Sequence, residues 1–223
     1  ASLDPHAIND EISVRAAGHI YESLVKQDEN LDIIPSLAES WERVSDTEIV
    51  FNLRKGVKFH NGEEMKASDV KFSLERAASN PIVMGSLWAV DSVEVMDDYT
   101  AKVILKEPYG EILAALSSVT ASIVSEKAVN EHGDKFGINP VGTGAMKLQE
   151  WMQNNYIIFE GFEDYWGGKP LTNTISIKII PEGTMRNVQL KAGHIDFSYM
   201  VQPTDVEAVL ANKKLKAESL LMT

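Results

Sequence analysis

The chain contains no cysteine. This absence excludes disulfide bonds, thiolate metal ligands and cysteine nucleophiles from the whole sequence. A cysteine-free chain also suits folding in an oxidising compartment, because no thiol is available for mispairing. Enzymes with a cysteine nucleophile and proteins that bind a metal through thiolates are therefore excluded by composition alone.

Basic residues are scarce relative to acidic ones. Lys and Arg number 21 against 33 Asp and Glu, which gives a formal net charge of −12 and a sequence pI of about 4.9. Nucleic acids and anionic membrane surfaces are bound through Lys and Arg that neutralise phosphates, so this balance argues against both partners. The sequence also has no apolar run near the ~20 residues that cross a bilayer.

Motifs for catalysis and metal binding are missing as well. The sequence has five histidines: His6, His19, His60, His132 and His194. None has metal-ligand spacing, so we interpret all five as structural. There is no Gly-x-Ser-x-Gly elbow, and Gly142-Thr143-Gly144 lacks the spacing of a phosphate-binding loop. We therefore predict no enzyme activity, no cofactor and no metal site.

The two ends lack features of a complete exported protein. No signal-peptide pattern is present at residues 1–5, so either export is not used or a segment was removed. Residues 215–223 read as a strand that leads elsewhere, without a cap or a polar tail. We expect the chain to be a piece of a longer protein.

The 223 residues, 44% of them hydrophobic, suit one large or two small globular domains. The clearest local signal lies at residues 49–76. Ile49, Phe51 and Leu53 alternate as in a strand, Asn61-Gly62 predicts a turn, and Ser68-Asp69 predicts the start of a helix.

The same reasoning predicts further elements along the chain. The expected helices begin at Asn9 or Asp10 (with Ile12, Ala16, Ile20 and Leu24 on one face) and cover 35–40, 69–78, 108–117, 125–132, 184–191 and 204–212, the last with Thr204 and Glu207 as a capping box. The expected strands cover 48–53, 92–96, 100–106, 120–124, 145–152, 156–162, 175–179 and 195–199. This mixture predicts an α/β or α+β protein with more than one lobe.

Several motifs follow one another in a specific order. They are LDPH at 3–6, HIYESLV at 19–25, PSLAESWE at 35–42, FNLRKGVKFHNGE at 51–63, ASDVKFSLERA at 67–77, NPVGTGAMKL at 139–148, FEDYWGGKP at 162–170 and LKAGHIDFSY at 190–199. In this order they resemble the extracytoplasmic solute-binding proteins of ABC importers, the peptide/nickel/oligopeptide-binding family (family 5), over essentially the whole chain. One departure is Ala145-Met146, where the family commonly has proline and an aromatic residue.

The resemblance implies an α/β fold like that of periplasmic binding proteins (type II, cluster C), with a discontinuous large lobe and an inserted α+β domain. On that pattern, residues 1–34 and 139–223 form the first domain and residues 35–138 the second. A third domain, which supplies the other half of the ligand cleft in the family, lies outside this sequence.

The resemblance further implies the substrate-binding component of an ABC transporter, which captures peptides or a related small solute. It would be a monomer that works with ABC permease membrane subunits, in the periplasm or as a lipid-anchored lipoprotein on the cell surface. Two alternatives stay open: binding of nickel or a metal chelate, and a stand-alone protein-interaction module without a complete cleft. A hydrolase ranks last, because no nucleophile–base set is visible.

Ligand contacts are expected from aromatic and flexible apolar side chains, since binding sites are concave and largely apolar. The candidates are Tyr21, Trp88, Tyr199 and Met200. Tyr21 lies in the HIYESLV motif, and Tyr199 and Met200 follow the GHIDF segment. The competing interpretation is core packing, because an aromatic side chain buries a large area wherever it lies.

Overall fold

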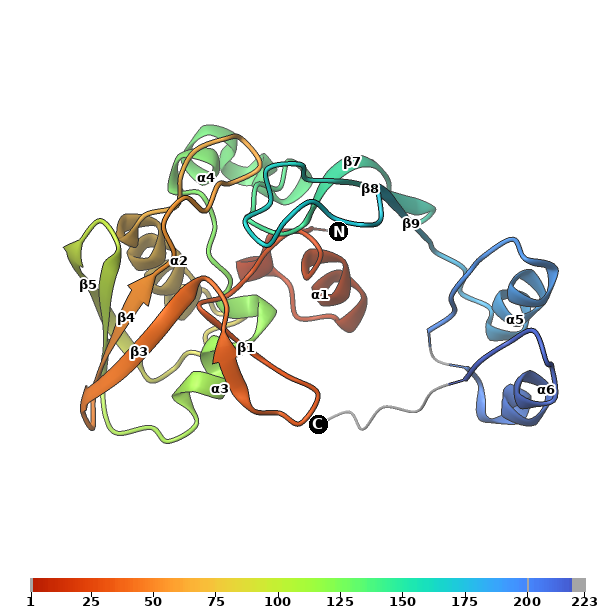
Figure 1. Cartoon of the computed structure of the whole chain (residues 1–223), viewed down its shortest axis with the longest axis horizontal. Coiled ribbons are helices and arrows are strands. Elements are labelled where there is room, and N and C mark those ends of the chain that lie inside the picture. The colour runs from red at the N-terminus through yellow and green to blue at the C-terminus, as the bar shows by residue number, and fades with distance from the viewer. Residues whose placement is uncertain (1, 200, 218–223) are drawn as a thin grey trace. The chain divides into compact units, whose positions relative to one another are not determined.

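Four antiparallel strands in the order β3-β4-β6-β5 form the largest sheet of the computed structural model (Figure 1). The structure describes residues 2–199 and 201–217. The strands of this sheet are β3 (Ala38–Ser45), β4 (Glu48–Leu53), β5 (Val90–Asp97) and β6 (Thr100–Leu105). Phe51 of β4 stands opposite Trp41 on one side and Ala101 on the other. Residues far apart in the sequence therefore define the register of the central strand.

The hydrophobic core lies against one face of this sheet. Ile49, Phe51 and Leu53 are all buried, which confirms the alternation predicted for this strand. The helix α2 (Ala67–Ser79) packs against β5 and contributes Val70 and Leu74 to the same cluster. The strand–turn–helix segment is thus the centre of the largest core.

Two smaller sheets and five further α-helices lie in the part of the chain that the structure describes. The strands β1 (Val25–Gln27) and β2 (Ile33–Pro35) form a pair, and β7 (Met146–Met152), β8 (Tyr156–Gly161) and β9 (Thr174–Lys178) form a three-stranded sheet. The other helices are α1 (Glu11–Ala17), α3 (Ile112–Leu116), α4 (Glu126–His132), α5 (Gly183–Ala192) and α6 (Val206–Leu210). Short 3₁₀ helices cover Pro5–Ala7, Val119–Ala121, Gly133–Ile138 and Pro203–Asp205.

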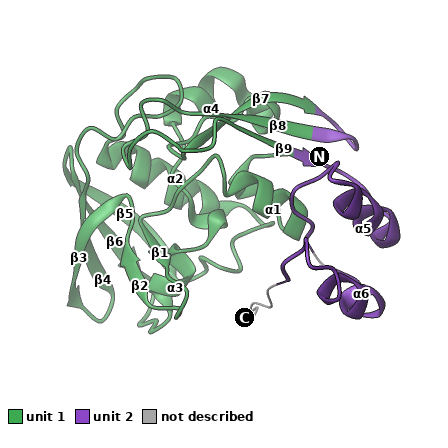
Figure 2. Cartoon of the chain, turned by 45° about the vertical axis from the view of Figure 1, so that its right-hand side comes forward, with its two compact units in different colours: residues 1–151, 157–176 green, residues 152–156, 177–223 purple. Residues whose placement is uncertain are grey.

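The chain divides into two compact units (Figure 2). Unit 1 comprises residues 1–151 and 157–176, and unit 2 comprises residues 152–156 and 177–223. Unit 1 contains the four-stranded sheet and its core, whereas unit 2 contains α5 and α6. The domain division expected at residues 34/35 and 138/139 stays a prediction.

Local capping predictions are confirmed at three helix ends. The Asp10 carboxylate accepts a hydrogen bond from the Ser13 backbone N–H at the start of α1. The Ser125 hydroxyl accepts one from the Ala128 backbone N–H at the start of α4. Gly193 ends α5 with a φ of 73°, a left-handed conformation that favours glycine. These predictions held because capping depends on neighbouring residues alone.

Three predicted helices, which correspond to α1, α2 and α3, differ from the structure in their bounds. The helix expected to carry Ile20 and Leu24 ends at Ala17; both residues are buried in the following non-helical stretch, and Ile12 is exposed. The helix α2 starts at Ala67, one residue before Ser68, and the Asp69 carboxylate instead accepts the Lys66 backbone N–H. The helix expected over 108–117 is confined to 112–116.

The helix predicted for residues 35–40 is wrong. Pro35 is the last residue of β2, and Ala38 opens β3 opposite Leu53. Pairing with the adjacent strands β1 and β4 overrides the local signal of a proline. The strand β3, the outer partner of β4, was therefore missed.

Three other predicted elements differ from the structure. Residues 120–124 are not a strand: the first two belong to the 3₁₀ helix Val119–Ala121, and the Ile123 backbone N–H donates to the Glu22 backbone carbonyl. Residues 195–199 form no strand either. The capping box of Thr204 and Glu207 is absent, because Pro203–Asp205 forms a 3₁₀ helix before α6.

Candidate functional site

The structure places the predicted ligand contacts in different surroundings. Tyr21 and Trp88 belong to unit 1 and make separate ring contacts, with Phe136 and with Tyr109 respectively. Tyr199 is half-buried in unit 2, and Met200 lies outside the described residues. Contact of these four residues with ligand stays a prediction.

Tyr21 is a core residue in this structure. Its ring centroid lies 6.3 Å from that of Phe136, and only 2% of the residue is exposed. Its hydroxyl has no hydrogen-bond partner among the described residues. Burial raises the pKa of this hydroxyl well above its ordinary value; the Val141 backbone N–H opposes the shift without reaching hydrogen-bond geometry. Trp88, in contrast, is 42% exposed.

A carboxylate next to Tyr21 joins three segments of unit 1. Glu22 accepts hydrogen bonds from the Thr143 hydroxyl at 2.9 Å, the Tyr165 hydroxyl at 2.7 Å and the Trp166 indole N–H at 2.8 Å. The Arg54 guanidinium lies 4.6 Å from the Trp166 ring centroid. We call these five residues the Glu22 junction. It connects residues 19–25 to the glycine-rich turn and to the aromatic loop.

Burial sets the electrostatics of the Glu22 junction. It raises the pKa of the Glu22 carboxyl, and the three hydrogen bonds, which stabilise the ionised form, oppose this shift. Burial and the Glu22 charge also raise the pKa of the Tyr165 hydroxyl above its ordinary value. The junction is thus suited to hold loops in place; it offers no nucleophile paired with a base.

The glycine-rich turn at residues 142–144 is fixed on two sides. The Gly144 backbone N–H donates to Ile20, and the His60 backbone N–H donates to Gly142. A side chain at position 142 would place its Cβ 2.2 Å from the Ile20 carbonyl oxygen, so only glycine fits there. This close approach accounts for the glycines and confirms that the turn is not a phosphate-binding loop before a helix, because β7 follows it.

A second buried polar cluster joins the start of the chain to α2. Arg76 donates to the Asp4 carboxylate and to His6 Nδ1, and His6 Nε2–H donates to the Ser122 carbonyl. Burial and the Arg76 charge lower the pKa of His6 to about 4. Burial alone would raise the pKa of Asp4, but the hydrogen bonds and charge of Arg76 outweigh it and hold that pKa below its ordinary value. His6 is therefore structural, as expected.

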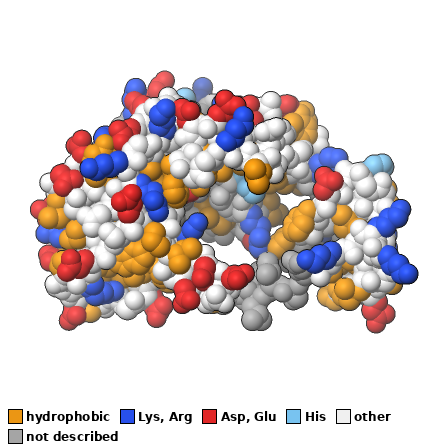
Figure 3. All heavy atoms as spheres, in the orientation of Figure 1, with side chains coloured by type: hydrophobic (Ala, Val, Ile, Leu, Met, Phe, Trp, Pro, Cys, Tyr) orange, Lys and Arg blue, Asp and Glu red, His pale blue; other side chains and the backbone are white. Residues whose placement is uncertain are grey.

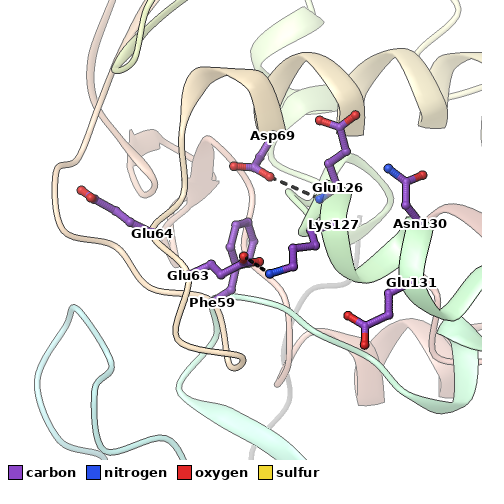
Figure 4. Close-up of a pocket in the computed structure, with 8 residues that line it drawn as sticks. All are labelled: Phe59, Glu63, Glu64, Asp69, Glu126, Lys127, Asn130 and Glu131. Atoms are coloured by element: carbon purple, nitrogen blue, oxygen red, sulfur yellow. Dashed lines mark hydrogen bonds and ion pairs between the residues drawn. The ribbon is translucent and has the colours of Figure 1, made fainter.

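An open hollow of about 710 Å³ lies at the surface between the Asn61-Gly62 turn region and α4 (Figure 4). It is lined by Phe59, Glu63, Glu64, Asp69, Glu126, Lys127, Asn130 and Glu131. Lys127 is paired with Glu63 at 2.7 Å, and Asp69 accepts the Glu126 backbone N–H. Burial and the charges of Glu126 and Glu63 raise the pKa of Asp69. The Asp69 carboxylate, which also accepts the Lys66 backbone N–H, thus connects the starts of α2 and α4.

The surface charges and the helices bear on the expected partners. On the face shown in Figure 3, acidic and basic side chains are interspersed over unit 1. Among the described residues, no group of three or more His, Asp or Glu side chains is arranged to hold a metal ion. Within the same residues, no helix has the length and apolarity needed to cross a membrane.

Sequence reasoning missed Glu22 and the role of His60. An available signal for Glu22 was an acidic residue inside the run from Ile20 to Val25, where the other side chains are buried. A charge in such a run must find partners when the chain folds. Its partners, however, come from residues more than 100 positions away, and nothing local identifies them.

Comparison with known proteins places the chain in a recognised group. The family model described as "Bacterial extracellular solute-binding proteins, family 5 Middle" matches residues 32–220. The "Glutathione-binding protein GsiB" of Pectobacterium atrosepticum is 32% identical over 219 residues, which cover 96% of this chain and 43% of that protein. The chain thus spans less than half the length of this relative.

Solved structures agree with the fold. The periplasmic binding protein DppA from Helicobacter pylori, in complex with the peptide STSA, is 30% identical with a TM-score of 0.87; the match covers 96% of this chain and 47% of that one. NikZ from Campylobacter jejuni, in complex with Ni(L-His), is 26% identical with a TM-score of 0.85, covering 96% of this chain and 43% of that one. The predicted α/β fold of periplasmic binding proteins is confirmed.

Proposed function

The chain belongs to the bacterial extracellular solute-binding proteins of family 5, and from this premise we propose that it is the ligand-capturing part of an ABC importer. It takes up a peptide or a related small solute outside the cytoplasm and delivers it to the permease subunits in the membrane. The observation that carries this proposal is the family match over residues 32–220. The structural match to a peptide-bound binding protein supports the choice of a peptide.

Capture requires no chemical step. Ligand binding between two lobes shifts an open–closed equilibrium toward the closed form, and no bond is made or broken. Because the chain spans less than half of the GsiB relative, we assign this cycle to a longer protein. In it, residues 1–34 and 139–223 form the first domain, residues 35–138 the inserted one, and a third domain closes the cleft.

We assign ligand contacts to Tyr21, Trp88, Tyr199 and Met200, because pockets of this kind are lined by aromatic and apolar side chains. The exposed Trp88 ring is accessible as it stands, whereas the covered Tyr21 ring requires a movement of its neighbours. We further propose that the protein is a monomer without enzyme activity, either free in the periplasm or held outside the membrane by a lipid anchor.

A metal chelate is the second candidate ligand. The similarity to NikZ, solved with Ni(L-His), is the observation that favours it. Peptide and chelate differ in how the ligand is recognised, because a chelate needs imidazole or carboxylate groups near the metal, whereas a peptide needs partners for its backbone and termini. The two candidates therefore predict different behaviour with chelators.

Native mass spectrometry of the full-length protein tests the proposal. The protein is incubated with di- to nonapeptides, with glutathione and with nickel–histidine, with and without EDTA. We expect a bound peptide or glutathione that EDTA does not remove, together with a more compact small-angle scattering profile. Retention of nickel–histidine alone would favour the chelate, and identical profiles with every ligand would contradict capture by closure.

Two cheaper measurements address the remaining alternatives. The intact mass of the natural protein, compared with the 24.7 kDa of this chain, separates a longer protein from a stand-alone interaction module. A peptidase screen of the same sample should show no turnover. Reproducible cleavage that increases with protein purity would favour the hydrolase alternative.

A further inference from the structure

His60 makes three hydrogen bonds to one short turn. Its backbone N–H donates to the Gly142 carbonyl at 2.9 Å, and its ring Nε2 lies 2.9 Å from the Gly144 carbonyl oxygen. The other ring nitrogen, Nδ1, lies 3.4 Å from the Gly142 backbone nitrogen. A carbonyl only accepts and a backbone N–H only donates, so the ring must carry its proton on Nε2 and a lone pair on Nδ1.

Hydrogen bonds hold the turn on its other side as well. On its other side, Gly144 donates to the Ile20 carbonyl at 2.8 Å, and Thr143 donates to Glu22. A Cβ at position 142 would lie 2.6 Å from the Tyr21 ring carbon Cδ1. The turn therefore covers Tyr21, and His60 bonds to the opposite side of the turn.

We propose that His60 is an acid-sensitive latch, which holds the turn 142–144 against residues 19–22 only while its ring is uncharged. A proton on Nδ1 would face the Gly142 N–H, so two donors would oppose each other where one bond now exists. The Nε2–H bond to Gly144 would survive, but the turn would lose one of its two ring contacts. The latch is a property of unit 1 and does not depend on the proposed function.

Apart from the Gly144 carbonyl, the groups around the ring do not stabilise its charged form. Lys147 of β7 carries a like charge, and Phe162, which follows β8, presents an apolar ring 5.0 Å away by centroid. Glu22, the carboxylate on the far side of the turn, is bonded to Thr143, Tyr165 and Trp166. Burial first, and then Lys147, lower the pKa of His60 to about 4, against the opposing effect of the Gly144 bond.

The size of the effect follows from proton linkage. A released ring regains an ordinary pKa near 6.5, so it binds protons in a range where the latched ring does not. The population of the released turn should increase on the order of 100-fold between pH 7 and pH 4. Most of this increase lies between pH 6 and pH 4.

Amide hydrogen exchange tests the latch on the chain as it stands. After correction for the intrinsic pH dependence of exchange, the Gly142 and Gly144 amides should lose about 100-fold of their protection between pH 7 and pH 4. His60→Gln keeps a neutral donor and acceptor, so its protection should be nearly constant. His194→Gln, at an exposed histidine of unit 2, should behave like the unmodified chain.

The outcomes are distinct. Protection that does not change with pH in the unmodified chain, or that falls equally in His60→Gln, overturns the latch. If His60→Gln fails to fold, the ¹⁵N spectrum of the ring decides the question in the unmodified chain. A neutral Nε2–H tautomer that persists to about pH 4 supports the latch, and a ring that titrates near 6.5 overturns it.

Discussion

The sheet region of unit 1 and the helical unit 2 differ in how far they bury their large apolar side chains. Phe51, Leu74 and Val103 of unit 1 are completely buried. In unit 2, Phe197 is 78% exposed and Leu210 is 63% exposed. Among the described residues of unit 2, only Asn187 and Val209 are buried. Regular helices such as α5 thus form from local signals, whereas stability comes from long-range burial.

The largest expected effect is a cavity in the core of unit 1. Phe51→Ala removes a fully buried ring from the central strand and should lower the free energy of unfolding by about 3–5 kcal/mol. Phe197→Ala, the matched change in unit 2, should cost less than about 0.5 kcal/mol, because that ring is exposed. Urea unfolding followed by circular dichroism measures both. Equal losses would mean that the contrast between the units is unfounded.

The Glu22 junction should give the next largest effect. Glu22→Ala removes the acceptor of three hydrogen bonds and leaves the Thr143, Tyr165 and Trp166 donors without it, at a cost of about 2–4 kcal/mol. Glu207→Ala, at an exposed carboxylate of unit 2, is the control and should change stability by less than about 0.5 kcal/mol. A quenched or shifted Trp166 fluorescence should accompany the first change. If Glu22→Ala leaves the free energy of unfolding unchanged, the junction does not stabilise the fold.

Acid should destabilise the chain through His6. Its pKa in the folded chain is about 4, below the ordinary value of about 6.5, so the unfolded chain binds the proton first as the pH falls. The contribution is complete above pH 6.5 and is lost progressively toward pH 4, on the order of 2–3 kcal/mol.

Thermal unfolding between pH 7 and pH 4 measures this loss. His6→Gln should show a weaker pH dependence, with the remainder contributed by His60, whose pKa is also about 4. His194→Gln of unit 2 should leave the profile unchanged, because that side chain is exposed. A profile in His6→Gln identical to that of the unmodified chain would contradict the assignment.

Tyr21→Phe should have the smallest effect. The change removes a buried hydroxyl that has no hydrogen-bond partner among the described residues, so stability should change by less than about 0.5 kcal/mol or increase slightly. Calorimetry on the full-length protein then separates core packing from ligand contact. If peptide affinity falls more than about fivefold while stability is unchanged, the Tyr21 hydroxyl contacts the ligand. Unchanged affinity excludes a ligand contact through this hydroxyl.

Features that depend on neighbours in the sequence were predictable. The alternation of Ile49, Phe51 and Leu53 identified β4, and Asp10, Ser125 and Gly193 marked helix ends. These signals are local because a strand exposes every second side chain to one face and a cap bonds to a residue two or three positions away. The ordered motifs likewise identified the family, which the comparisons confirm.

Features that depend on distant partners were not predictable. The sequence by itself determined the family, the α/β class and the helix ends at Asp10, Ser125 and Gly193. The tertiary structure decided that Glu22 is satisfied by Thr143, Tyr165 and Trp166, and that His60 holds the turn over Tyr21. The physical reason is that a buried polar group needs a partner, and only the folded chain brings that partner within about 3 Å.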